Sequence, residues 1–250
     1  MKKLVTAVLQ KCHIEIRRTN KPQKLPSDFE VLHQQIYQKV APFTMTSPER
    51  IYSLIEAVQY IVKNKIKGDI VECGVWKGGS MLSVAETFIH LNETERTLFL
   101  YDTFEGMSEP GEEDKAFFGK SAQELLLHDV NKENNLVWAY STLDTVKATM
   151  QLSKYPSSQI KYIKGKVEDS IPASMPESIA ILRLDTDWYE STKHELIHLF
   201  PLLTQGGVLI LDDYGFWQGA RKAADEYFAE KNIQILLNRI DETGRIAIKQ

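Results

Sequence analysis

Short apolar runs alternate with longer segments of helical spacing along most of this chain, and this alternation restricts its fold more than any other feature. The runs that we interpret as strands are residues 70–72, 98–101, 160–163, 179–184, 208–211, 233–236 and 245–248. Strands that alternate with helices form a mostly parallel sheet with helices on both faces. The last two runs are joined by a connection of hairpin length, so we expect the final strand to be antiparallel. The sequence therefore predicts an α/β fold with seven strands.

Residues 1–45 precede this alternation, and we interpret them as an N-terminal helical extension. Their apolar side chains recur at helical spacing, namely Leu4, Val8, Phe29, Leu32, Ile36 and Val40. Residues 46–250 form the main domain. It opens with Ser47-Pro48, a typical N-cap followed by the residue favoured at the first helical position, so we expect a helix from there to about Lys67.

Charge and cysteine content exclude several classes of protein. The 30 basic and 34 acidic residues give a net charge of -4, without the basic cluster that nucleic-acid binding requires. The two cysteines lack metal-site spacing, which indicates a reduced, cytoplasmic protein. The apolar start is broken at Gln10, with no cleavage site after it, and the other apolar runs have strand length. We therefore expect neither secretion nor a membrane span.

A glycine-rich turn follows the first predicted strand and leads into a helix. Its glycines, at positions 74, 78 and 79, fit neither the dinucleotide fingerprint nor the phosphate loop. Glu72, two residues before the first glycine, is typical of sites for nucleoside ligands that lack a pyrophosphate. Asp102 ends the second strand, where a carboxylate can accept hydrogen bonds from ribose hydroxyls. The residues alone leave the alternative open that the glycines only allow close packing of strand and helix.

Two acidic pairs follow two successive predicted strands. Asp185 and Asp187 end one strand, and Asp212 and Asp213 end the next. If the strands are adjacent, these carboxylates converge at the edge where α/β folds bind ligands. Such a group would take up protons unless a cation neutralised it, and oxygen ligands without His or Cys favour Mg²⁺. The alternative is that the aspartates cap helices or lie in solvated turns.

The segment 102–119 is long, acidic and punctuated by glycine and proline, yet it contains three phenylalanines. This composition favours a lid whose aromatic side chains dock when the site is occupied. A solvated surface loop is the alternative.

Taken together, these motifs resemble those of the macrocin O-methyltransferase family, which are S-adenosylmethionine- and magnesium-dependent enzymes that methylate sugar hydroxyls of natural products. The resemblance rests on segments 44–50, 72–79, 101–106, 182–192 and 206–215, and it covers most of the chain after residue 40. It implies the class I methyltransferase sheet, a Rossmann-like arrangement with strand order 3-2-1-4-5-7-6. In that order the strands that end at Asp185 and Asp212 are neighbours.

The resemblance also implies roles for individual residues. Asp187 would be the general base, and the metal ligands would be Asp185, Asp212 and Asp213. Residues expected around S-adenosylmethionine are Thr46, Ser47, Glu72, Gly74, Trp76, Gly78, Ser80, Asp102, Glu168, Asp169 and Asp185. The expected partner is a small molecule with a free hydroxyl, and the oligomeric state is left open. Thr186 stands where the family leads us to expect glycine, and the first forty residues match poorly, so the acceptor is not identified.

Two other functions remain as alternatives. Asp185-Thr186-Asp187 is formally the D-x-D metal site of nucleotide-sugar glycosyltransferases, although the second acidic pair and the lack of a basic cluster for a diphosphate weaken that interpretation. The other alternative is a non-catalytic module that binds S-adenosylmethionine. Cofactor binding alone does not require the four aspartates, so their presence argues against this alternative.

Overall fold

The structure, a computed structural model, describes residues 25–127 and 136–250. Seven strands form a single sheet in these residues: β1 (Asp69–Cys73), β2 (Leu98–Asp102), β3 (Ile160–Lys164), β4 (Ile179–Leu184), β5 (Leu203–Leu211), β6 (Asn238–Arg239) and β7 (Arg245–Ile248). The strand order is β3-β2-β1-β4-β5-β7-β6, as the family resemblance implied. Strands β1 to β5 are parallel, and β7 is antiparallel to both of its neighbours, which confirms the predicted final strand.

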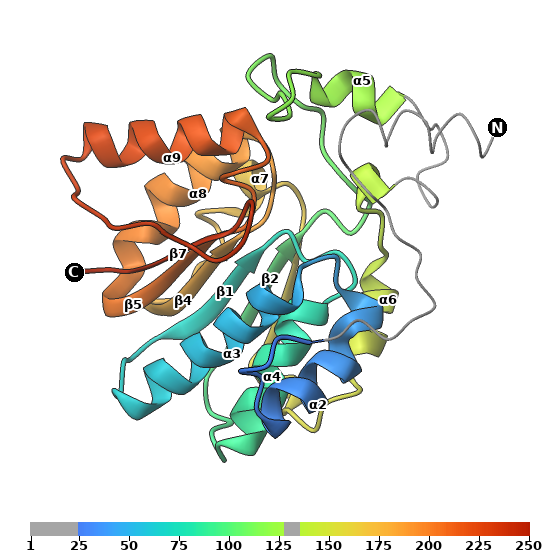
Figure 1. Cartoon of the computed structure of the whole chain (residues 1–250), viewed down its shortest axis with the longest axis vertical. Coiled ribbons are helices and arrows are strands. Elements are labelled where there is room, and N and C mark those ends of the chain that lie inside the picture. The colour runs from blue at the N-terminus through green and yellow to red at the C-terminus, as the bar shows by residue number, and fades with distance from the viewer. Residues whose placement is uncertain (1–24, 128–135) are drawn as a thin grey trace.

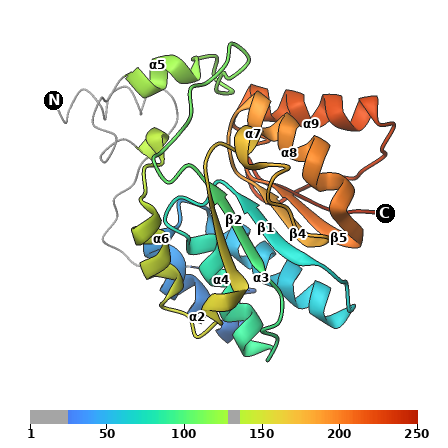
Figure 2. The same ribbon diagram turned by 180° about the vertical axis from the view of Figure 1, so that it is seen from behind.

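Helices cover both faces of the sheet (Figures 1 and 2). One face carries α2 (Val31–Val40), α3 (Pro48–Lys63), α4 (Gly79–His90) and α6 (Leu143–Met150). The other carries α7 (Val167–Ser170), α8 (Tyr189–Leu199) and α9 (Gln218–Glu230). The short helix α5 (Ala122–Leu127) lies away from the sheet, beyond the carboxyl ends of the parallel strands. Four 3-10 turns complete the described helical structure: Ala41–Phe43, Leu136–Trp138, Ser157–Gln159 and Phe200–Leu202.

Alternation of side chains along the strands divides the core into two apolar layers. Ile70 and Ile181 belong to the layer under α3 and α4, whereas Val71 and Leu182 belong to the layer under α8 and α9. These central strands are buried on both faces, which explains their near-continuous apolar sequences. Full burial of such a side chain contributes about 1.5–3 kcal/mol, so the sheet is a stable platform for the loops at its edge.

The N-terminal extension joins the same core. The predicted helix on Phe29 to Val40 is α2, and its Ile36 and Val40 belong to the apolar layer of α3 and α4. The helical spacing predicted for Leu4 and Val8 lies outside the described residues, and the division at residue 45 stays a prediction. In the described part of the chain, no helix has both the length and the apolar character to cross a membrane.

The sixth strand is where the sequence prediction was wrong. We expected it at residues 233–236, but β6 is Asn238–Arg239. Ile233 and Ile235 are partly buried against the core while Leu236 is exposed, so the run has the side-chain alternation of a strand. The run pairs with no strand, because on the side away from β5 the strand β7 pairs only with Asn238 and Arg239. The spacing of apolar residues predicts which side chains are buried, but it does not predict whether a neighbouring strand is present to pair with the run.

Two boundaries at the edge of the sheet opposite the carboxyl strand ends also differ from the prediction. Helix α3 ends at Lys63, before the expected Lys67. Strand β5 begins at Leu203, five residues before the predicted start at residue 208. The register between β4 and β5 shifts there, and Gly206 has a φ of 81°, a conformation that lets the chain continue through an irregular position.

Candidate active site

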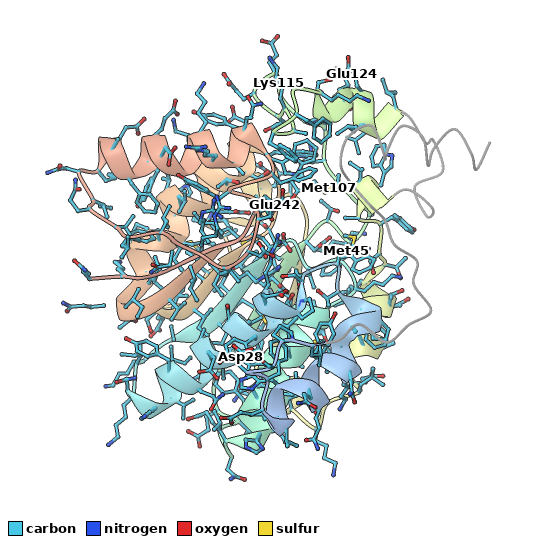
Figure 3. The ribbon with its side chains drawn as sticks, viewed as in Figure 1. Asp28, Met45, Met107, Lys115, Glu124 and Glu242 are labelled. Atoms are coloured by element: carbon cyan, nitrogen blue, oxygen red, sulfur yellow. The ribbon has the colours of Figure 1, made fainter. Side chains whose placement is uncertain are left out.

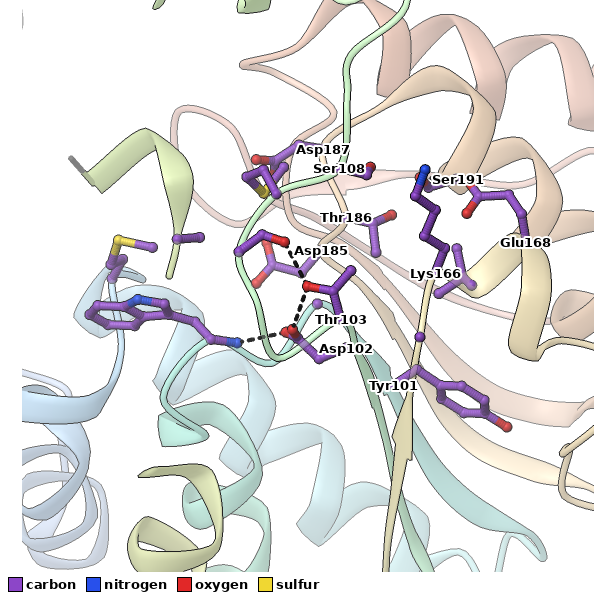
Figure 4. Close-up of a pocket in the computed structure, with 18 residues that line it drawn as sticks. Tyr101, Asp102, Thr103, Ser108, Lys166, Glu168, Asp185, Thr186, Asp187 and Ser191 are labelled. Carbon is purple, nitrogen blue, oxygen red and sulfur yellow. Dashed lines mark hydrogen bonds between the residues drawn. The ribbon is translucent and has the colours of Figure 1, made fainter. Parts of the chain in front are cut away.

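A cavity opens at the carboxyl ends of β1, β2 and β4 (Figure 4). The empty space between its walls is about 690 Å³, a volume that includes open solvent at its mouth. In Figure 4, Asp185 and Asp187 lie above Asp102, and Glu168 lies to their right. Met45 and Met107, from segments far apart in the sequence, both line the cavity, and Figure 3 shows them on the same side of the molecule. The cavity therefore lies where ligands of open α/β sheets bind.

Asp102 fastens the glycine-rich turn to the end of β2. Its Oδ2 accepts hydrogen bonds from the backbone N–H groups of Val75, at 2.7 Å, and Trp76, at 3.1 Å. Its Oδ1 accepts one from the N–H of Phe104 at 2.6 Å. Burial raises the pKa of Asp102, and these hydrogen bonds oppose that effect. The Thr103 hydroxyl contacts Oδ1 of Asp102 at 3.5 Å, but it donates at the much shorter distance of 2.6 Å to the carbonyl of Gly106. Because a carboxylate has about four acceptor positions, one position of Asp102 stays available toward the cavity.

Gly74 brings this turn against β4. Its φ is 83°, and a Cβ at this position would overlap the backbone carbonyl oxygen of Asp185. Only glycine therefore allows the turn to approach the aspartate that closely. Close packing, which the sequence left as an alternative to ligand binding, is thus one of the functions of this glycine.

A buried arginine lies beneath the cavity. Glu72 and Arg183 are direct partners in the register of β1 and β4, on the face that carries α3. The Arg183 guanidinium contacts Oε1 of Glu72 at 2.6 Å, Oδ2 of Asp185 at 2.7 Å and Oδ1 of Asp212 at 2.6 Å. Burial raises the pKa of Glu72 to about 7, although Arg183 opposes the shift. Glu72, which we expected at the cofactor, is therefore part of an ion-pair network and does not line the cavity.

A second arginine ties this network to the C-terminal hairpin. Arg50 of α3 forms ion pairs with Asp212 and, at 2.8 Å, with Asp241, and it donates a hydrogen bond to the hydroxyl of Thr243. Ser47, another expected cofactor contact, caps α3 and donates a hydrogen bond to Asp241 at 2.6 Å. Its hydroxyl therefore has a structural role in this arrangement.

Three carboxylates form the acidic group that the sequence predicted at this edge. Asp185, Asp187 and Asp213 each place one oxygen within 4.8 Å of the others. Asp212 is not part of this group, because one of its oxygens contacts Arg183 and the other contacts Arg50. The predicted ligand set of Asp185, Asp212 and Asp213 therefore differs from the observed grouping, in which Asp187 takes the place of Asp212.

The acidic group fits a hard divalent cation. Oδ2 of Asp213 is buried and has no hydrogen-bond partner. Burial raises the pKa of Asp187 to about 7, and it also raises the pKa values of Asp185 and Asp213. Carboxylates outnumber the two guanidinium groups here, and all the candidate ligand atoms are oxygens. A cation such as Mg²⁺ would relieve this repulsion with the ligand type that it prefers.

A second cavity adjoins the first on the side of α3 and α9. Both cavities are lined by Met45, Trp76, Ala139, Asp185 and Asp187. The second has aromatic walls, formed by Phe43, Trp76, Phe216 and Trp217. The two aspartates thus face two adjacent spaces, one of them strongly aromatic.

The predicted site residues separate into three groups. The first cavity contains Gly74, Trp76, Asp102, Glu168, Asp185 and Asp187. The second adds Thr46, Ser80, Asp212 and Asp213. Neither cavity is lined by Ser47, Glu72, Gly78 or Asp169. Gly78 precedes α4 with a φ of 87°, and Asp169 belongs to α7. Any cofactor contact of these last four residues stays a prediction.

Sequence reasoning missed the two arginines and the aromatic pair Phe216-Trp217. A signal for Arg183 was present, since a charged residue inside the buried run Leu-Arg-Leu requires partners. The aromatic pair follows Asp213 closely enough to have been assigned to the same edge. Arg50 gave no such signal, because its partners lie about 160 to 190 residues away along the chain.

The predicted lid is docked onto the beginning of α9 in this structure. Ala116 forms a bridge with Trp217, and the N–H of Phe117 donates to the carbonyl of Phe216 at 2.9 Å. Phe104 is buried in the core, whereas Phe117 is 51% exposed and contacts the ring of Phe216 edge-on. Opening and closing of this loop stay predictions.

Comparison with known proteins agrees with this geometry. The family model described as "Macrocin-O-methyltransferase (TylF)" matches residues 7–248. A curated relative from Streptomyces olivaceus, 8-demethyl-8-(2,3-dimethoxy-alpha-L-rhamnosyl)-tetracenomycin-C 4'-O-methyltransferase, is 33% identical over 201 residues, which are 80% of this chain and 73% of the relative. Demethyldecarbamoylnovobiocin O-methyltransferase from Streptomyces niveus is 30% identical over the same shares.

Solved structures give the same result. The O-methyltransferase NovP has a TM-score of 0.72 and 29% identity, covering 83% of this chain and 82% of its own. These matches are to O-methyltransferases and therefore reject the two alternative functions, the glycosyltransferase and the non-catalytic module. The chain belongs to the macrocin O-methyltransferase family and is an O-methyltransferase.

Proposed function

We propose that this protein transfers a methyl group from S-adenosylmethionine to a sugar hydroxyl of a natural product, with the help of a hard divalent cation such as Mg²⁺. The observation that carries the proposal is the position of Asp185 and Asp187, which line both cavities and belong to the acidic group. A donor in one cavity and an acceptor in the other would meet at these carboxylates. Bringing two reactants together in this way supplies much of the rate enhancement of a transfer reaction.

The first cavity is the proposed cofactor site. Asp102 would accept a hydrogen bond from a ribose hydroxyl, with the one acceptor position that Val75, Trp76 and Phe104 leave free. The turn at Gly74 would hold the methionine part. The acidic surroundings favour a positively charged sulfonium, and this attraction weakens when the methyl group has left and the charge is gone. Two fold neighbours, from Podospora anserina and Bacillus cereus, are described as structures with bound SAH, which supports this assignment.

The second cavity is the proposed acceptor site. Trp76, Phe216 and Trp217 offer flat apolar surfaces to the C–H face of a sugar ring and exclude water from the reacting hydroxyl. The name of the Streptomyces olivaceus relative refers to a rhamnosyl tetracenomycin, which supports a glycosylated natural product as the acceptor class.

Asp185 and Asp213 are the residues that would hold the cation, and a bound divalent cation stabilises the alkoxide form of a hydroxyl. Asp187 lies beside them and can accept the hydroxyl proton on one carboxylate oxygen. Its φ of 70° places it in a conformation that few non-glycine residues adopt, which is common for residues aimed into an active site. Asp212 would act indirectly in this scheme, by holding Arg50 and Arg183 in place.

Calorimetric titration tests the proposal at the level of the ligand. We expect saturable binding of S-adenosylhomocysteine and S-adenosylmethionine, and no binding of UDP-glucose or NAD. Methyl transfer is then measured as S-adenosylhomocysteine release with a panel of rhamnosylated natural products, with their aglycones as controls. Binding of UDP-glucose without binding of the sulfonium ligands would overturn the proposal, as would equal methylation of the aglycones. A cytoplasmic location and a lack of nucleic-acid binding stay predictions, and the oligomeric state stays open.

A further inference from the structure

Asp114 is a buried acid in a segment whose neighbouring acids are exposed. It belongs to the loop 103–121 and is only 1% exposed, whereas Glu112 and Glu113 face solvent. Its Oδ1 accepts a hydrogen bond from the backbone N–H of Tyr189 at 2.8 Å, and its Oδ2 accepts one from the N–H of Gly111 at 2.7 Å. Tyr189 is the first residue of α8. Asp114 therefore caps a helix that is distant in sequence.

The cap that Asp114 supplies is not provided by α8 itself. Trp188 stands at the N-cap position, and its side chain makes no capping hydrogen bond. The Trp188 indole N–H donates to the carbonyl of Ser108 in the same loop at 3.1 Å. The N–H of Gln218, the first residue of α9, donates to the carbonyl of Lys115 at 2.8 Å. The loop is thus joined to the beginnings of both helices.

Gly219 provides a second, independent sign that this place is built around the Asp114 carboxylate. It is the second residue of α9, and a Cβ there would overlap Oδ1 of Asp114 and lie 3.1 Å from the N–H nitrogen of Tyr189. Glycine is less favourable than alanine in a helix. Its presence here leaves room for the carboxylate.

The helix that Asp114 caps begins directly after the turn that carries Asp187. Asp187 has a positive φ of 70°, and a non-glycine residue keeps such a conformation only when its surroundings hold it. Before Asp187, the Thr186 hydroxyl donates to the buried Glu195 at 3.0 Å. After it, the chain enters α8 through the N–H that Asp114 binds. The turn is therefore fastened on both sides.

We propose that Asp114 is a positioning residue, which fixes the turn that aims Asp187 into the two cavities and makes the loop 103–121 a part of the catalytic wall. The inference rests on the proposed function, because it requires Asp187 to act on the acceptor. Asp114 lines neither cavity, so it acts only through Asp187. Misplacement of a reacting group by about 1 Å costs up to about a hundredfold in rate.

The test compares Asp114→Ala and Asp114→Asn with Glu113→Gln. Glu113 is the adjacent residue and forms an exposed ion pair with Lys222 at 2.8 Å, so its variant is the matched control. Hydrogen exchange of the peptide 186–192 reports the Tyr189 amide directly. We expect Asp114→Ala to speed this exchange and to lower kcat by about ten- to hundredfold. The dissociation constant of S-adenosylhomocysteine should change by less than about threefold, a difference below 1 kcal/mol. Asp114→Asn should recover much of kcat, since its amide oxygen can still accept from Tyr189.

Gly219→Ala separates positioning from a general loss of stability. Its methyl group displaces the Asp114 carboxylate without removing the acid, so we expect the same fall in kcat. The double variant Asp114→Ala/Gly219→Ala should be no slower than either single variant, because the methyl group at position 219 then meets no carboxylate. Losses of kcat that add up in the double variant would overturn the proposal. So would an Asp114→Ala variant whose kcat is unchanged although the peptide 186–192 exchanges faster. Absence of methyl transfer in the unsubstituted protein would instead refute the proposed function, while the exchange result for Tyr189 would stand.

Discussion

At the scale of single residues, Arg183 shows how one buried charge organises a site. Its guanidinium contacts one carboxylate on β1 and two that directly follow β4 and β5, and the side chain is 5% exposed. A guanidinium has five N–H donors in a fixed plane, which a lysine cannot reproduce. Removal of Arg183 leaves Glu72 and Asp185 without an arginine partner, whereas Asp212 keeps Arg50. The loss of one partner of a buried ion pair is more costly than replacement of the whole pair.

We therefore predict that Arg183→Met lowers the free energy of unfolding by about 3–5 kcal/mol. Arg183→Lys should recover only part of this loss, because an ammonium group cannot contact all three carboxylates in the same geometry. Chemical denaturation measures the effect, with Arg221→Met as control. Arg221 is exposed and pairs only with Asp225 among the ion pairs of the described residues. An unfolding midpoint for Arg183→Met equal to that of the control variant would contradict this account of the network.

At the scale of elements, the site depends on a link between α3 and the β6–β7 hairpin. Asp241 lies in that hairpin and accepts hydrogen bonds from Ser47 and Arg50 at the beginning of α3. Burial alone would raise its pKa, but the hydrogen bonds from Ser47, Gly244 and Arg50 outweigh it and lower the pKa to about 2. Because the folded pKa lies below the unfolded one, the ionised carboxylate stabilises the folded state above about pH 4.

Asp241→Ala should therefore cost about 2 kcal/mol near neutral pH, the free energy that corresponds to this pKa difference. The difference between the two proteins should shrink as the pH falls from about 4 to about 2, where the carboxylate takes up a proton. Urea unfolding at several pH values provides the measurement. A stability difference that stays constant over this range would show that Asp241 contributes through packing and not through its charge.

At the scale of the whole molecule, we expect the acidic edge to make stability depend on pH and, if a cation binds there, on metal. Burial raises the pKa of Asp187 to about 7, and the charges of Asp185 and Asp212 add to the effect. A folded pKa above the unfolded value means that the folded state binds more protons between the two values. Stability should then be greatest below about pH 4 for this group and be lost as the pH rises through about 7. A divalent cation would remove this loss by neutralising the ionised form.

In chelator, we predict a lower melting temperature at about pH 8 than at about pH 5.5, and Mg²⁺ should raise the value mainly at the higher pH. Asp187→Asn has no such proton to lose, so its melting temperature should fall less between the two pH values. Differential scanning calorimetry can measure all these states. If the melting temperatures of the two proteins have the same pH dependence in chelator, the carboxylate of Asp187 does not interact with the other carboxylates of the acidic group.

The sequence predicted the sheet well, because buried central strands have near-continuous apolar runs and connections of recognisable length. It misplaced β6, since an apolar run with alternating burial resembles a strand even where no partner reaches it. The acidic edge was predicted from strand ends alone. The separation of Asp212 from the other aspartates was not, because it depends on Arg50 and Arg183, whose contacts with Asp212 join three separate elements. Long-range ion pairs leave little trace in local patterns.

The most direct test of the central claim is the Mg²⁺ dependence of methyl transfer, measured for the unsubstituted protein, Asp185→Asn and Asp187→Asn. If Asp185 holds the cation, its variant should need more Mg²⁺ for half-maximal rate, since a neutral amide binds a hard cation less well. If Asp187 accepts the proton, its variant should shift the Mg²⁺ midpoint much less than Asp185→Asn does and should lose turnover by roughly 10²–10⁴, the usual effect of removing a general base. A shift of the Mg²⁺ midpoint in Asp187→Asn as large as that in Asp185→Asn would contradict the account and make both residues ligands.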